Sequence, residues 1–543
     1  MTALRVGALT CVWAGLAGLT QALSIALPWS EASGIPFSGQ PVWWLQILSL
    51  AMLVGLVNRQ PSFRNGLLLG WVFAVTWMAG TFWWLFISMH NYGGLAAPLA
   101  VAAVLGLAAF LGSFYGLACG IYGSFRAAAL VKPAQTAIVF VATWTLAELI
   151  RGMWLTGFPW GAGGYAQVDG PLAALAPWVG VYGVGAVAAA GAALLAGFAT
   201  THANPARAAN RAALGLLGAL VLAVSAMLVF GKPDAAQSSG TLSVTLLQGN
   251  IPQDEKFQSG SGVPQALRWY GEQLTGSKTQ LVVAPETAIP ILPEQLPEDF
   301  FLDWSQRLWP GSAAMVGIPL GNFRDGYTNS VLGLRAGQPP SATLGAVFPA
   351  DSYQYDKHHL VPFGEFIPAM FKWFTQMMNI PLGDFNRGAV GQPSFNFAGQ
   401  RLAPNICYED LFGEELAVRF IDPATAPTIL VNISNIGWFG NSVSIDQHLH
   451  ISRMRALELG RPMIRATNTG ATVIIDHTGR VTHSLPRHTR GALVGEVQGR
   501  SGTTPYAWWA SRFGMWPLWI TLVTIVLIAA RATYKRAGGL KGL

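Results

Sequence analysis

Cys407 is the one cysteine of this chain that lies outside its long apolar stretches. It follows a short apolar run, and two carboxylates, Glu409 and Asp410, lie two and three residues after it. Cys11 and Cys119 lie within hydrophobic stretches, where a small buried side chain is the ordinary interpretation. A cysteine without a disulfide partner is either an inert buried residue or a nucleophile. Cys407 is therefore a candidate nucleophile whose chemistry depends on the residues that the fold brings to it.

A cysteine nucleophile needs a base that takes its proton and a positive group that stabilises the oxyanion formed on the attacked carbonyl. Two other segments resemble the one around Cys407, because each places a charged residue beside a strand-like run. One ends on Glu286, and the other presents Lys357 and Glu365. Glu286 can act as the base and Lys357 as the positive group. The alternative for each of these two residues, taken alone, is an ordinary surface ion pair.

The composition is that of a membrane protein. Of the 543 residues, 52% are hydrophobic and only 11% are charged, with 21 Trp and 62 Gly, which is too apolar for an ordinary soluble enzyme. The net charge of +7 comes from basic residues scattered at the ends of apolar segments rather than from an arginine-rich arm. Contact with lipid headgroups explains this charge better than nucleic acid, and no nucleic-acid partner is expected.

The sequence predicts roughly eight transmembrane helices, each requiring about 20 apolar residues. The stretches lie at 7–28, 42–57, 66–89, 94–123, 134–150, 171–200, 210–230 and 515–531. The first stretch could instead be a cleaved signal peptide. We therefore expect a transmembrane domain over 1–235 and a C-terminal transmembrane helix over 512–534.

Between these parts, residues 241–500 carry short β-branched runs, polar turns and most of the acidic residues, which is typical of a soluble α/β domain. Lysine and arginine fall on alternate sides of successive spans, and the positive-inside rule then places this domain outside the cytoplasm. Unpaired thiols are a liability in oxidising compartments. This placement strengthens the interpretation of Cys407 as a functional residue.

The order Glu286, Lys357, Cys407 resembles the nitrilase superfamily, whose members use a Glu-Lys-Cys triad on an αββα sandwich. With seven spans before the domain and one after it, the chain is similar to the apolipoprotein N-acyltransferase family. The local motifs that carry this resemblance are Gln-Gly-Asn-Ile-Pro-Gln from Gln248, Pro-Glu-Thr-Ala-Ile-Pro from Pro285, Lys-His-His-Leu-Val-Pro-Phe-Gly-Glu from Lys357, Ile-Cys-Tyr-Glu-Asp from Ile406, Trp-Phe-Gly from Trp438 and the run from Met454 to Gly470. The implied architecture is a polytopic helical membrane domain that carries a nitrilase-like sandwich.

The resemblance implies a ping-pong acyl transfer at the periplasmic side of a bacterial inner membrane. Cys407 would attack the sn-1 ester of a phospholipid, with phosphatidylethanolamine as the expected donor, while Glu286 takes the thiol proton and Lys357 stabilises the oxyanion. The resulting thioester would then be attacked by the N-terminal amine of a diacylglyceryl-cysteine in an apolipoprotein. No metal or cofactor is expected.

Further residues receive roles from the same resemblance. Glu365 and Glu409 are expected to support the triad by orienting Lys357 and the substrate amine, although Glu409 could instead only cap the helix after the nucleophile. Tyr408 is expected to shape the oxyanion site through its backbone N–H.

Four aromatic residues are candidates for a lipid entrance. Trp160 and Phe158 lie in a loop between two spans, where the alternative is an ordinary interfacial belt. Trp438 and Phe439 lie between two glycines that could act as hinges of a mobile wall, and the alternative for them is core packing.

The sequence departs from the family pattern at Phe257, where Trp is expected, and at Ile436, Ser444 and Ile445. These departures bear on the lid and on contacts with the acceptor, not on the triad. His448 lies on a predicted helix without a second metal ligand at suitable spacing, so we expect it to make a structural hydrogen bond.

Two other functions remain as alternatives. A membrane-anchored amidase or nitrilase would keep the triad and use water as acceptor, but a single span would suffice for that task. A transporter would require paired ionisable groups near the centres of its spans, whereas Glu148 and Arg151 lie near a helix end.

Overall fold

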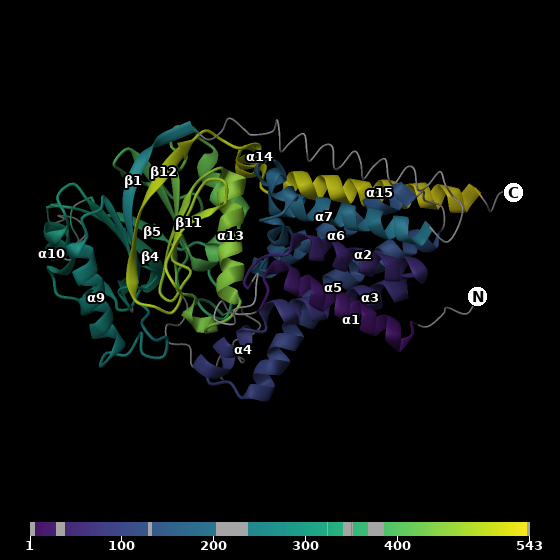
Figure 1. Cartoon of the computed structure of the whole chain (residues 1–543), viewed down its shortest axis with the longest axis horizontal. Helices are drawn as coiled ribbons and strands as arrows, with labels where there is room; N and C mark the ends of the chain where they lie inside the picture. The colour runs from purple at the N-terminus through teal and green to yellow at the C-terminus, as the bar shows by residue number, and fades with distance from the viewer. Residues whose placement is uncertain are drawn as a thin grey trace. The chain divides into compact units, whose positions relative to one another are not determined.

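The computed structural model describes residues 6–28, 38–128, 133–201, 237–322, 324–339, 349, 351–367 and 385–539. The chain divides into two compact units. The first comprises residues 1–83, 98–232 and 513–543, and the second comprises residues 84–97 and 233–512. Figure 1 shows the helices of the first unit and the sheets of the second.

The first unit is built from long apolar helices. They are α1 (Ala8–Ile25), α2 (Trp43–Arg59), α3 (Phe63–Phe82), α5 (Ala97–Ala127), α6 (Pro133–Met153), α7 (Ala176–Thr201) and α15 (Trp516–Gly539). Within the described part of the chain, six helices are long and apolar enough to cross a membrane, and α2 is a shorter apolar helix. The sequence-based number of about eight is therefore approximate, and the stretch 210–230 lies outside the described residues.

Glycines allow two of these helices to pack closely. A Cβ atom at Gly66 would lie 2.2 Å from the carbonyl oxygen of Cys119, and one at Gly70 would lie 2.6 Å from the Cys119 Cβ. Since real side chains do not approach so closely, α3 and α5 can make this contact only with glycine at both positions. Cys119 is thus a buried packing residue of the helix pair.

A buried arginine ties the loop after α6 to the helices. The Arg151 guanidinium donates to the carbonyl oxygens of Phe158 at 2.8 Å and Trp160 at 2.7 Å, and also to the Tyr115 hydroxyl at 2.8 Å. Glu148 accepts a bond from the Gly163 backbone N–H at 3.1 Å. Because buried charges must be hydrogen-bonded, these two ionisable residues serve to hold the 157–163 loop.

The predicted span 66–89 is interrupted in the structure. Helix α3 ends at Phe82, and residues 84–97 belong to the second unit, where they form the short helices α4 (Leu85–Ile87) and η2 (Ser88–Tyr92). The buried Trp84 indole donates to the Gln447 side chain at 3.1 Å. This polar bond gives Trp84 a partner on the second unit that an apolar span would lack.

The second unit contains two six-stranded sheets (Figure 1). The first has the order β12 (Gly491–Ser501), β1 (Gln237–Gln248), β2 (Leu281–Val283), β3 (Ala313–Asn322), β4 (Gly326–Arg335) and β5 (Tyr353–Asp356). The second has the order β11 (Val481–Ser484), β10 (Val473–Ile475), β9 (Met463–Thr467), β8 (Ile429–Ser434), β7 (Gln400–Ile406) and β6 (Phe395–Phe397). In both sheets the three neighbouring strands β1–β2–β3 and β7–β8–β9 are parallel.

The two sheets pack face to face, with helices outside them. One buried apolar cluster joins side chains of both sheets, including Leu246, Val283, Ile406 and Ile433. A second cluster lies between the first sheet and the helices α9 (Gly262–Gly276) and α10 (Phe300–Arg307). Helix α13 (Ser444–Leu459) lies on the outer side of the second sheet (Figure 1). The arrangement is the αββα sandwich that the sequence predicts.

The parallel strands explain where the functional residues lie. Ile406 at the end of β7 pairs with Ile433, the residue before Ser434 at the end of β8. Strand β2 ends at Val283, shortly before Glu286. Residues that follow parallel neighbouring strands meet at one edge of a sheet. Cys407 and Asn435 are therefore brought together, and Glu286 reaches the same place from the facing sheet.

Candidate active site

Cys407 occupies a sharp turn between β7 and the short helix η8 (Cys407–Leu411). Its φ angle is 51°, a left-handed conformation that is unusual for a residue with a side chain. The Cys407 carbonyl accepts a hydrogen bond from the Asn432 side chain at 3.4 Å and lies 3.2 Å from Nε2 of His448. Such a conformation persists only where surrounding contacts hold it. The strand end, Asn432 and His448 together supply those contacts.

His448 belongs to a buried network behind the nucleophile. Its Nε2 lies 2.9 Å from Oδ1 of Asp410, and its Nδ1 lies 3.0 Å from a guanidinium nitrogen of Arg465. Because a guanidinium can only donate, Nδ1 must accept, and the imidazole proton is placed on Nε2. That proton faces the Asp410 carboxylate and the Cys407 carbonyl. The predicted structural hydrogen bond of His448 is thus confirmed.

Glu286 is held by three donors. Its Oε1 accepts from the Asn329 side chain at 2.7 Å and from Lys357 Nζ at 3.2 Å, while its Oε2 accepts from the Asn435 backbone N–H at 2.8 Å. Burial alone would raise the pKa of Glu286, but the charge of Lys357 and the bonds from Asn329 and Asn435 outweigh it and hold the pKa below its ordinary value. Glu286 is therefore a carboxylate at neutral pH.

Lys357 follows β5 and lies between two carboxylates. Its Nζ is 2.8 Å from Oε1 of Glu365 and 3.2 Å from Oε1 of Glu286, and the lysine side chain is buried. Burial by itself would lower the pKa of Lys357, but Glu286 and Glu365 raise it above the ordinary value. The ammonium is permanently charged, and the alternative of an exposed surface ion pair does not apply.

The environment of Cys407 favours the neutral thiol. Burial raises its pKa most, the Glu286 charge raises it further, and Lys357 acts in the opposite direction. The resting state consequently pairs a thiol with a carboxylate. A proton can pass from Cys407 to Glu286 only when an attacked carbonyl takes up the developing charge.

Glu365 and Glu409 are both buried but hold different groups. Glu365 accepts from Lys357 and Asn329, and its second oxygen accepts from the Val361 backbone N–H at 2.9 Å. It thus contacts the ammonium directly.

The Glu409 carboxylate accepts from the backbone N–H groups of Ile406 and His358, both at 2.6 Å, and from the Tyr355 hydroxyl at 2.9 Å. Ile406 precedes Cys407 and His358 follows Lys357. Glu409 therefore ties together the backbone on either side of the site.

The Tyr408 ring is buried and packs near His359 and Phe412, with ring centroids 5.7 and 5.3 Å away. Its proposed role concerns only the backbone N–H and stays a prediction.

The four aromatic residues predicted to line a lipid entrance divide between the two units. Trp160 is buried and Phe158 is half-buried in the first unit. Trp438 and Phe439 are half-buried in the second unit, in the short helix η10 (Ile436–Phe439). The Phe439 ring lies 4.3 Å from the Trp84 ring. Their role in lipid entry stays a prediction.

Sequence reasoning missed three residues that contact Glu286: Lys256, Asn329 and Asn435. Asn435 directly follows a buried strand, a position that could have drawn attention to it. Lys256 follows two acidic residues, Asp254 and Glu255, in a loop, and Asn329 lies within a strand, so nothing in their local pattern marked them. Of the positions that depart from the family pattern, Ile436, Ser444 and Ile445 are buried and Phe257 is half-buried.

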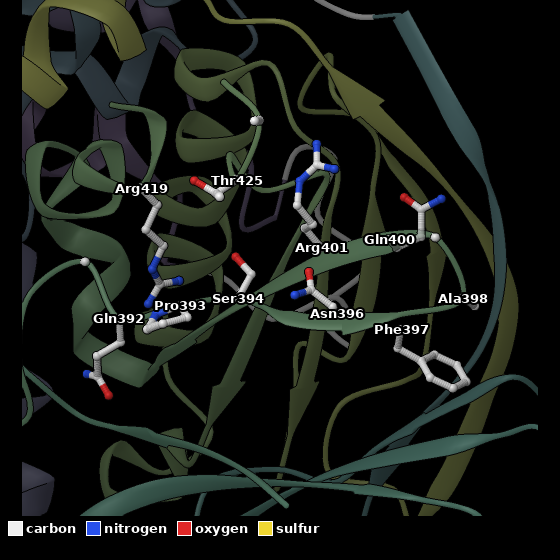
Figure 2. Close-up of a pocket in the computed structure, with 13 residues that line it drawn as sticks. Gln392, Pro393, Ser394, Asn396, Phe397, Ala398, Gln400, Arg401, Arg419 and Thr425 are labelled. Carbon is white, nitrogen blue, oxygen red and sulfur yellow. The ribbon is translucent and has the colours of Figure 1, made fainter. Parts of the chain in front are cut away.

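A cavity of the second unit lies away from this site. Figure 2 shows it at the beginning of β7, with a volume of about 580 Å³. Its lining includes Gln400, Arg401 and Arg419, whereas Cys407 follows the other end of the same strand. No predicted site residue lines this cavity. Among the residues that the structure describes, no group of three or more His, Cys, Asp or Glu could hold a metal ion.

The two-sheet sandwich is that of a carbon–nitrogen hydrolase domain of the nitrilase type, and residues 243–506 match the family model for carbon–nitrogen hydrolases. Residues 32–194 match the model of the apolipoprotein N-acyltransferase N-terminal domain. The chain belongs to the apolipoprotein N-acyltransferase family. It is a membrane protein with an N-acyltransferase domain of the nitrilase superfamily, and the predicted resemblance is confirmed.

The relatives cover nearly the whole chain. An apolipoprotein N-acyltransferase from Verminephrobacter eiseniae is 56% identical, with 93% of each chain covered. One from Ralstonia nicotianae is 44% identical, with 95% of each chain covered. Among solved structures, a carbon–nitrogen hydrolase from Helicobacter pylori is 16% identical, covers 51% of this chain and 94% of its own, and has a TM-score of 0.34. The two apolipoprotein N-acyltransferases, with their coverage of nearly the whole chain, do not favour the hydrolase and transporter alternatives.

Proposed function

We propose that this protein moves a fatty acyl chain from a phospholipid, through a thioester on Cys407, to the N-terminal amine of diacylglyceryl-cysteine in an apolipoprotein. The observation that carries the proposal is the buried Glu286–Lys357–Glu365 cluster, whose charges act on the Cys407 thiol at a strained strand end. Membership of the family supports lipid and lipoprotein as the two substrates.

In the first half-reaction the Cys407 proton passes to the Glu286 carboxylate as sulfur attacks the sn-1 ester carbonyl. Lys357 stabilises the oxyanion of the tetrahedral intermediate, in a buried setting where its charge acts strongly. The carbon–oxygen bond to glycerol then breaks, and Glu286 returns its proton to the leaving alkoxide. The products are a lysophospholipid and an acyl thioester on Cys407. Phosphatidylethanolamine is the proposed donor.

In the second half-reaction the acceptor amine attacks the thioester carbonyl. Glu286 takes a proton from the nitrogen, the carbon–sulfur bond breaks, and Cys407 recovers its proton. Glu365 keeps Lys357 in place through both steps, because its carboxylate contacts the ammonium directly at 2.8 Å. Glu409 acts through the backbone on both sides of the site. Tyr408 is proposed to add its backbone N–H to the oxyanion site.

The proposed location is the bacterial inner membrane, with residues 241–500 on the periplasmic side between a transmembrane region over 1–235 and a C-terminal helix over 512–534. Both substrates are lipids, so the acyl chain must reach Cys407 from the bilayer. Trp160, Phe158, Trp438 and Phe439 are proposed as the aromatic residues along that route.

The proposal is tested by trapping the intermediate. Purified protein incubated with phosphatidylethanolamine should yield a fatty acyl adduct on Cys407 that neutral hydroxylamine removes, detected by mass spectrometry of the Cys407 peptide. Cys407→Ala should form no adduct while keeping its fold. Addition of a diacylated lipopeptide should discharge the adduct into triacylated product. Transfer that persists in Cys407→Ala would contradict the mechanism, and release of free fatty acid alone would favour a hydrolase.

A further inference from the structure

Lys256 is a second buried lysine beside the site. It lies in the turn after β1, its side chain is buried, and its Nζ donates to the backbone carbonyl of Glu286 at 2.9 Å. Its ammonium lies within electrostatic range of the Glu286 carboxylate and of the Cys407 sulfur. None of the steps described above uses this lysine. A buried charge that no reaction step uses requires an explanation, because desolvation of an ammonium is costly.

The turn that carries Lys256 holds Glu286 from two directions. Lys256 fixes the carbonyl of Glu286, and the Gln253 side chain accepts from the Asn435 side chain at 2.8 Å. Asn435 in turn donates its backbone N–H to the Glu286 carboxylate. Thr287, the next residue, has a φ of 47°, a conformation that surrounding contacts must hold in place. The 253–256 turn therefore sets both the backbone and the carboxylate of Glu286.

The site has an excess of negative charge that a second cation would neutralise. One ammonium, on Lys357, contacts two carboxylates, those of Glu286 and Glu365. These three groups sum to one negative charge in the resting state. When Glu286 takes the Cys407 proton, that negative charge moves to the sulfur and is not removed. A protonated Lys256 brings the sum to zero in both states.

We propose that Lys256 is a positioning residue for acyl transfer, which fixes the main chain of Glu286 and supplies the second positive charge that balances the site when Cys407 becomes a thiolate. The inference rests on the proposed function for its link to catalysis. The proposed effect of the Lys256 charge on the Cys407 thiolate does not depend on which acceptor receives the acyl chain. Burial lowers the pKa of Lys256 to about 7, against the opposing influence of Glu286 and Cys407, so this charge is present below that pH and is lost above it.

The test is the rate at which iodoacetamide alkylates Cys407, measured against pH by mass spectrometry in full-length protein in detergent. Lys256→Gln keeps a hydrogen-bond donor and loses the charge, and Lys256→Met loses both. Below pH 7, where Lys256 is charged, each variant should alkylate about 10- to 1000-fold more slowly than the wild type, because an opposite charge at close range shifts a pKa by about 1 to 3 units and one unit is a factor of ten. The matched control is Lys278→Met at an exposed lysine, which should not change the profile.

Comparison of the variants separates the two parts of the inference. A Lys256→Gln profile that coincides with that of the wild type would overturn the charge role, since a purely structural lysine does not move the thiol profile. If neither variant folds, as judged by gel filtration, the wild type provides the test. Its alkylation profile should show two titration steps, the lower one near pH 7, and a single step would overturn the inference. Failure of the proposed function is distinct, because alkylation would still respond to Lys256 while no acyl thioester formed.

Discussion

Nζ of Lys357 lies 3.2 Å from Oε1 of Glu286, and both side chains are buried. An ion pair in this setting stabilises the fold only weakly, because its attraction must offset the desolvation of both groups. The ion pair matters for the proposed reaction more than for stability. In the proposed mechanism this ion pair keeps Glu286 ionised, and it keeps a cation where the oxyanion would form.

Glu286→Gln should abolish thioester formation while the protein still folds. The amide preserves the shape and can accept from Asn329, but it cannot take the thiol proton, and loss of a general base costs about 10² to 10⁴ in rate. Single-turnover acylation of Cys407 by phospholipid measures the effect. Glu272→Gln, at an exposed carboxylate on α9, serves as the control and should acylate at the wild-type rate. Acylation of Glu286→Gln at more than about a tenth of that rate would exclude Glu286 as the base.

Lys357→Met should affect both catalysis and stability. Two buried carboxylates, Glu286 and Glu365, would lose their shared cation, and breaking a buried pair in this way costs about 3–5 kcal/mol. Acylation should fall by at least about 10² because the oxyanion loses its stabilising charge. Thermal unfolding in detergent and single-turnover acylation check the two effects. A stable variant with normal acylation would contradict the proposed role.

His448→Leu should loosen the nucleophile turn. The substitution removes the donor that faces the Cys407 carbonyl and leaves Asp410 and Arg465 without one partner each. Unsatisfied buried polar groups cost about 1–3 kcal/mol each. The unfolding temperature should therefore drop, and acylation should slow without a change in the pH profile of Cys407 alkylation. His483→Leu, on the exposed strand β11, is the control, and equal effects of the two substitutions would count against the network.

The stability of the protein should rise with pH above neutrality because of Lys256. Its pKa is lowered to about 7 from an ordinary 10.5, so between these values the unfolded chain binds more protons than the folded one. The free energy of unfolding then increases with pH, by up to about 1.4 kcal/mol per unit. Below about pH 7 the lysine is protonated in both the folded and the unfolded state, so it does not change the free energy of unfolding with pH.

The measurement is the unfolding temperature of wild type and Lys256→Met across pH 6 to 10, taken in the same detergent. The difference between the two proteins should grow in favour of the wild type above pH 7. A difference that is independent of pH would show that Lys256 titrates normally.

Much of this architecture could be predicted from local sequence. Long apolar stretches predicted the membrane helices, because the bilayer sets their length, and the structure has six of them within its described residues. Composition and short β-branched runs also predicted an α/β domain in the part of the chain that forms the two sheets. The end of helix α3 at Phe82 could not be predicted. The hydrogen bond that Trp84 makes with Gln447, far along the chain, leaves no signal in the local apolar pattern.

The sequence by itself determined that Glu286, Lys357 and Cys407 follow strand-like runs in the order typical of a family, and this identified the triad candidates. Only the tertiary structure decided that Lys357 contacts Glu365 as well as Glu286, that Glu409 holds backbone rather than the ammonium, and that Lys256 reaches the Glu286 carbonyl. The physical reason is that charge and hydrogen bonding act through space over a few ångströms. Neighbours at that distance come from both sheets of the sandwich, and a linear pattern does not record which of them meet.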